Sequence, residues 1–166
     1  MSREIGAKPT LLLALGNDIL GDDGVGLVVA ERLKDRVGEG VEILATSESG
    51  FRVMEFLEGY DNALLIDSVS TGQNPPGTVL EFTREAFARI KAPSPHYAGM
   101  SEVFELADRL GLTFPKNFRV LAMEIVSPKD FSVGLSPEVE RAIPGLVERA
   151  GELLLDWEKE KGAPDA

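Results

Sequence analysis

Apolar runs alternate along the chain with segments of helical periodicity, in the order that is typical of α/β proteins. Residues 10–15 (T-L-L-L-A-L) and 62–67 (N-A-L-L-I-D) are continuous apolar runs without polar alternation. Such runs indicate parallel strands that are buried on both faces. The same reasoning predicts three further strands, at 41–45, 78–82 and 118–125. Apolar positions at helical spacing predict four helices, at 24–37, 50–57, 102–110 and 136–157.

These elements predict an α/β fold, with one three-layer domain over residues 1–166. The expected sheet is five-stranded, twisted and mostly parallel, with helices on both faces. Ser136 and Pro137 suit the start of the last helix, as its cap and its first residue, and Pro144 is expected to kink or split that helix. Residues 158–166 are charged and contain Gly and Pro, so we expect a frayed tail. Ligands of such a sheet bind at the carboxyl ends of the strands.

The composition excludes several classes of protein. The chain has no Cys and a single His, His96, which excludes thiolate sites, a Cys nucleophile, three-histidine zinc sites and the H-E-x-x-H proteases. A formal net charge of −11 disfavours nucleic acids and anionic membrane surfaces as partners. No apolar run approaches the ~20 residues that span a bilayer, and the first residues lack the pattern of a signal peptide. We therefore expect a cytoplasmic protein, with a monomer as the default.

The turn after the first predicted strand carries two adjacent acids. Residues 15–26 read L-G-N-D-I-L-G-D-D-G-V-G. Glycine-rich turns between a strand and a helix often bind phosphate, but this spacing is neither G-x-G-x-x-G nor a P-loop. Asp22 and Asp23 would repel phosphate and suit a cation. The alternative on spacing alone is that one of them caps the helix that follows.

Asp67 and His96 are the other candidates for a site. Asp67 ends a predicted buried strand, where its side chain would reach the ligand crevice; the alternative is a turn-forming Asp. His96 lies in the proline-stiffened segment P-S-P-H-Y-A-G-M, and the alternative for it is a surface or hydrogen-bonding residue. Two carboxylates and one imidazole suit nickel, zinc or a similar divalent ion with coordination positions left open. An ion with an open position polarises a carbonyl or activates bound water.

With these residues in place, the sequence resembles the hydrogenase maturation proteases, endopeptidases that process the large subunit of nickel–iron hydrogenases. Residues 14–26 match nearly all of the family signature G-x-G-N-x-L-x-x-D-[ED]-G-x-G, with Ala14 in place of its first Gly. The match continues in order through N-A-L-L-I-D-S-V, P-G-T-V-L-E-F, S-P-H-Y-A-G-M and G-L-S-P-E-V. The segment T-S-E-S-G-F at 46–51 departs from the family's D-G-G-T-x-G. That loop helps to place the substrate, so the partner class is expected to differ.

The resemblance implies a hydrolase, a metal-dependent endopeptidase that removes a C-terminal extension from the immature large subunit after nickel insertion. It carries over Asp23, Asp67 and His96 as the catalytic-site residues that recognise the metal. Whether they also take a direct part in the chemistry is left open. The nickel would be supplied by the substrate, and zinc or cadmium could occupy the site in vitro. The implied partner is the large-subunit precursor of a nickel–iron hydrogenase.

Two other functions stay open from the sequence alone. The first is a non-catalytic, metal-dependent maturation checkpoint or chaperone on the same fold. The second is an α/β protein that binds phosphate or a nucleotide in the turn of residues 16–26.

Overall fold

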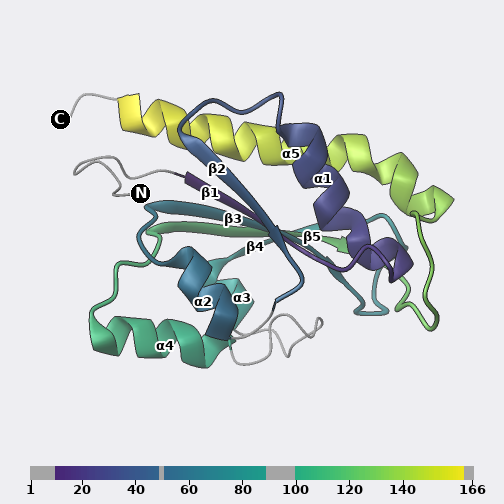
Figure 1. The fold of residues 1–166 in the computed structure, drawn as a ribbon, viewed down its shortest axis with the longest axis horizontal. Helices are drawn as coiled ribbons and strands as arrows, with labels where there is room; N and C mark the ends of the chain where they lie inside the picture. Colours follow the sequence, from purple (N-terminus) through teal and green to yellow (C-terminus); the bar gives the residue numbers. More distant parts are fainter. Residues whose placement is uncertain (1–9, 49–50, 89–99, 163–166) are drawn as a thin grey trace.

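The predicted fold class is confirmed by the computed structural model shown in Figure 1, which describes residues 10–48, 51–88 and 100–162. A five-stranded sheet runs through the described chain in the order β2-β1-β3-β5-β4, and only β4 is antiparallel to its neighbour. The strands are β1 (Thr10–Leu15), β2 (Val41–Thr46), β3 (Asn62–Val69), β4 (Val79–Thr83) and β5 (Asn117–Glu124).

Helices cover both faces of the sheet, which gives the three expected layers. Helices α1 and α5 pack on one face, and α2, α3 and α4 lie on the other (Figure 1). Their bounds are α1 (Val25–Leu33), α2 (Phe51–Leu57), α3 (Arg84–Ala88), α4 (Met100–Leu110) and α5 (Pro137–Gly162), and a 3-10 turn, η1 (Gly21–Gly24), precedes α1.

Alternate residues of the central strands supply two separate cores. Leu12, Leu64 and Leu121 face α1 and α5, whereas Leu13 and Leu65 face the other helices. All of them are fully buried. Because neither face of these strands meets water, the strands read as continuous apolar runs instead of alternating ones.

Helix α5 differs from its prediction at both Pro144 and its end. The helix is continuous across Pro144, so the predicted split is wrong. Pro144 lies on the exposed side of the helix, away from the sheet. The helix also runs on to Gly162, past its predicted end at residue 157, and the buried Leu154 and Trp157 anchor these last turns. Residues 163–166 of the predicted frayed tail lie outside the described residues, and the fraying stays a prediction. No helix in the described ranges is long and apolar enough to cross a membrane.

Two other boundaries and one additional helix depart from the sequence pattern. Helix α1 ends at Leu33 and not at residue 37, because the chain turns there, with the Arg36 N–H donating to the Leu33 carbonyl (3.0 Å). Strand β3 continues two residues past Asp67, to Val69. Helix α3 was not predicted, since its five residues are too few to show a helical period.

A chain of polar side chains fixes the register of the three central strands at their amino ends. The Asn62 amide donates to Thr10 Oγ1 (3.1 Å) on β1 and accepts at Oδ1 from the Asn117 amide (2.8 Å) on β5. These three residues are register partners in the sheet. Because a slip of one strand would break both bonds inside a buried environment, the carboxyl ends of the strands are held level as well.

Replacing Asn62 with Ala is therefore expected to lower the free energy of unfolding by about 2–3 kcal/mol, since one buried and one partly buried hydrogen bond lose their partner. Urea unfolding followed by circular dichroism measures the change. Gln73→Ala, at an exposed loop position, is the control and should shift stability by less than about 0.5 kcal/mol. Equal stability of Asn62→Ala and the parent chain would contradict the role of this polar chain.

Candidate functional site

Two glycines bring the turn after β1 against the ends of the central strands. A Cβ atom on Gly26 would lie 2.7 Å from the carbonyl oxygens of both Leu15 and Ile66. A Cβ atom on Gly16 would lie 2.3 Å from the carbonyl oxygen of Asp23. Any side chain at either position would push the turn and α1 away from the sheet. The two glycines thus place η1, and Asp23 with it, at the carboxyl end of β3.

Ser68 links Asp23 to Asp67 at this edge of the sheet. The Ser68 hydroxyl donates to Asp23 Oδ1 (2.7 Å), and the Ser68 N–H donates to Asp67 Oδ1 (2.7 Å). The Asp67 side chain is fully buried and Asp23 is partly buried. Asp67 sits within β3 and not in a turn, so the turn-forming interpretation is wrong. Two of the three predicted site residues are therefore neighbours, although they lie far apart in the sequence.

The third predicted residue, His96, lies outside the described residues. Within the described ranges there is no group of three or more His, Cys, Asp or Glu side chains that could hold a metal ion. The complete set of Asp23, Asp67 and His96 therefore stays a prediction. Asp23 and Asp67 supply carboxylate oxygens, which are common donors to divalent cations, so their chemistry fits a metal.

Asp22 has a different role from its neighbour Asp23. Its two carboxylate oxygens accept from Ser136, Oδ1 from the N–H (2.6 Å) and Oδ2 from the hydroxyl (2.8 Å). Ser136 immediately precedes α5, and its carbonyl accepts the Glu140 N–H (2.9 Å), as expected of a helix cap. Neither aspartate caps the helix that follows it, because the cap positions of η1 and α1 are Leu20 and Gly24. The capping interpretation is therefore wrong for that helix, and Asp22 instead ties the turn to the start of α5.

Glu124 is a buried acid at the same edge that the sequence reasoning missed. It ends β5 and accepts from the Thr71 N–H (2.7 Å), from the Thr71 hydroxyl and from the Asn74 amide (3.4 Å). Burial raises the pKa of Glu124, but the hydrogen bonds from Thr71 and Asn74 outweigh it, so the pKa is lowered from the ordinary value. Glu124 thereby fastens the loop that follows β3. Its signal in the sequence is a single acid within the apolar run L-A-M-E-I-V.

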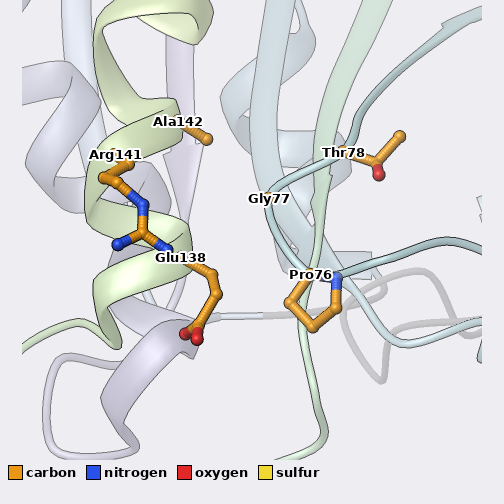
Figure 2. Close-up of a pocket in the computed structure, with 6 residues that line it drawn as sticks. All are labelled: Pro76, Gly77, Thr78, Glu138, Arg141 and Ala142. Atoms are coloured by element: carbon orange, nitrogen blue, oxygen red, sulfur yellow. The ribbon is translucent and has the colours of Figure 1, made fainter.

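A shallow cleft lies beside α5, but neither aspartate of the pair lines it. Figure 2 shows it between the loop before β4 and the first turns of α5, with Glu138 and Arg141 on the helix side. Its volume is about 390 Å³. Gly77 closes its inner side, where a Cβ atom would lie 3.0 Å from the Glu138 carbonyl oxygen. One acid and one base do not make a metal site, so this cleft adds no candidate to the predicted set of Asp23, Asp67 and His96.

Comparison with known proteins finds a family and several relatives. A family model described as hydrogenase maturation protease matches residues 27–152, a span that includes Asp67 and begins just after Asp23. The hydrogenase 2 maturation protease of Escherichia coli (strain K12) is 28% identical over 143 residues, which cover 84% of this chain and 86% of that protein. Protein FrxA of Pyrococcus furiosus is 34% identical over 144 residues, covering 82% of this chain and 95% of that protein.

A solved structure agrees with the fold. The hydrogenase maturating endopeptidase HybD from E. coli superposes with a TM-score of 0.78 at 26% sequence identity. The alignment covers 89% of this chain and 93% of that chain.

The contact between Asp22 and Ser136 is expected to stabilise the fold. Asp22→Ala should lower the free energy of unfolding by about 1–3 kcal/mol, because both Ser136 donors lose their acceptor. Ser136→Ala should cost about 1–2 kcal/mol, because it removes the hydroxyl donor and keeps the backbone N–H. The double variant should cost about 1 kcal/mol less than the sum of the two single variants, as measured in a double-mutant cycle by urea unfolding. Additive single effects would mean that the bond from the Ser136 hydroxyl to Asp22 contributes nothing.

Glu124 is expected to make stability dependent on pH. Since its pKa is lowered in the folded state, its contribution is present above the pKa of the unfolded chain and is lost as the pH falls through the folded-state pKa. Glu124→Gln should be less stable at neutral pH and should show a flatter decline between about pH 7 and about pH 3. Urea unfolding across that range is the measurement, with the exposed Glu85→Gln as control. If stability declines with pH in parallel for Glu124→Gln and the parent chain, Glu124 is not the origin of the pH dependence.

Proposed function

The chain belongs to the hydrogenase maturation protease family, and we propose that it removes a C-terminal extension from the immature large subunit of a nickel–iron hydrogenase. Membership makes it a hydrolase of the endopeptidase type. The observation that supports a site for this activity is the contact of Ser68 with both Asp23 and Asp67. It holds two acids from distant parts of the sequence at the rim where an α/β sheet binds its ligands.

The proposed signal for cleavage is nickel already bound in the precursor. Asp23, Asp67 and His96 would add oxygen and nitrogen donors to an ion that the precursor brings with it. The absence of Cys from the chain supports this arrangement, because a site without thiolates is a weak scavenger of soft metal ions. Without the ion the scissile peptide is not positioned, and a reaction that depends on positioning is slow. The metal thereby becomes a condition for processing.

The residues of the chain hold and orient the reacting groups. Ser68 fixes Asp23 Oδ1 and Asp67 Oδ1, so both carboxylates keep their direction before the precursor arrives. Asp67 is completely buried in the folded chain, so water does not compete with an ion for its carboxylate. An ion bound there supplies polarisation of a neighbouring peptide carbonyl. A cytoplasmic location and a monomeric state complete the proposal.

Asp23→Ala, Asp67→Ala and His96→Ala are each expected to lower the rate of precursor cleavage by about 100-fold or more, because each removes a donor to the ion. Ser68→Ala should have a smaller effect, of about tenfold, since it removes only the hydroxyl that orients Asp23 and keeps the backbone N–H that bonds Asp67. The assay incubates the purified chain with nickel-loaded large-subunit precursor and follows the intact mass of the precursor. Asp35→Ala and Asp156→Ala, at exposed positions, are the controls and should cleave normally.

Two results would contradict the proposal, each in a different part. Near-normal cleavage by all three donor variants would refute the assignment of these residues as the site, although the chain would still be a protease. Binding of the precursor by the parent chain with no change in precursor mass would instead favour a non-catalytic checkpoint. Thermal unfolding of each variant separates loss of the site from loss of the fold.

A further inference from the structure

Large apolar side chains are exposed on two loops that adjoin the site. Ile19, in the turn before η1, is 49% exposed. Phe131 and Val133, in the loop between β5 and α5, are 79% and 89% exposed. Single exposed apolar residues are common on protein surfaces, but apolar side chains gathered on one surface are typical of interaction sites.

The two loops are joined by their backbones in a way that gathers these side chains. The Ser132 N–H donates to the Ile19 carbonyl (2.9 Å), and the Gly21 N–H donates to the Ser132 carbonyl (2.7 Å). Leu20 and Ser132 are thus partners in a short parallel bridge. Ile19 directly precedes one residue of this bridge, and Phe131 and Val133 flank the other. The bridge therefore holds the backbones of these three exposed residues close together, and we call the three the rim patch.

The rim patch is fixed to the proposed site. The Asp23 N–H donates to the Leu20 carbonyl (3.2 Å), and the Asn17 N–H donates to the Asp23 carbonyl (3.3 Å). One folded turn therefore carries both Ile19 and Asp23. Any protein whose metal reaches Asp23 must come close to this patch.

We propose that the rim patch is a docking surface for an apolar area of the hydrogenase large-subunit precursor, next to the point where its metal is recognised. This inference rests on the proposed function, because it assumes that the precursor is the substrate. The continuity of the patch with the turn that carries Asp23 favours the precursor as occupant. A second copy of the chain is disfavoured, since each copy carries a net charge of −11 and two copies repel each other.

The test uses the full chain with Phe131→Ser and Val133→Ser combined, and Ile19→Ser as a second variant. These side chains are exposed, so the substitutions leave the core unchanged, and thermal unfolding verifies this. The control combines Leu110→Ser and Leu155→Ser, which alter apolar side chains that are 62% and 50% exposed on α4 and α5. Calorimetry measures binding of nickel-loaded precursor, and steady-state cleavage measures KM and kcat.

The rim-patch variants are expected to bind the precursor about tenfold more weakly or worse, with a matching rise in KM and with kcat within about twofold of the parent chain. The control should match the parent chain. Normal binding by the rim-patch variants, or equal weakening by the control, overturns the docking surface. If sedimentation shows a dimer of the parent chain and the variants abolish that dimer, the patch binds a second copy. That result also overturns the proposed docking of the precursor.

Failure of the proposed function gives a different result. If the parent chain binds the precursor and the rim-patch variants do not, while the mass of the precursor never changes, the docking surface stands and proteolysis is wrong. If the precursor is cleaved and the variants bind normally, proteolysis stands and the docking surface is wrong.

Discussion

The contact between the backbone of α1 and the ends of β1 and β3 is the constraint on which the site depends. Gly26 has no side chain, and a Cβ atom there would lie 2.7 Å from two strand carbonyl oxygens. The start of the helix therefore lies directly on the strand ends, and Asp23 comes within hydrogen-bond distance of Ser68. The polar chain from Thr10 through Asn62 to Asn117 keeps the same strands level from their other ends. Packing at one edge and register at the other together set the geometry of the two acids.

Most of the fold was predictable because burial leaves a direct trace in the sequence. The strands buried on both faces, such as β1, show as unbroken apolar runs, and the mostly parallel orientation followed from the helices between them, whereas the order of the strands was not predicted. Helix α3 left no such trace, since five residues do not complete a repeat. The end of α5 was misread because a charged segment resembles a tail, whereas the buried Trp157 holds it in the helix. Local composition does not reveal which tertiary contact anchors a polar segment.

The candidate site was predictable in part, for a related reason. Asp67 was identified because a carboxylate that ends an apolar strand has one expected place, the carboxyl edge of the sheet. On spacing alone Asp22 and Asp23 were equivalent candidates, and only the family resemblance selected Asp23. The structure separates them, since Asp22 accepts from Ser136 and Asp23 accepts from Ser68. Ser68 and Glu124 were missed because their partners lie 45 and 53 residues away along the chain.

The connection from β5 to α5 is fastened at its start, middle and end. The Ile125 N–H donates to the Val69 carbonyl (2.8 Å), Ser132 pairs with the turn that follows β1, and Ser136 is held by Asp22. A segment attached at three points has little conformational entropy left to lose when another protein binds to it. These attachments limit the conformations open to the connection, so in the proposed function this part of the rim is largely formed before the precursor binds. Most of the conformational change in that encounter would then fall to the precursor.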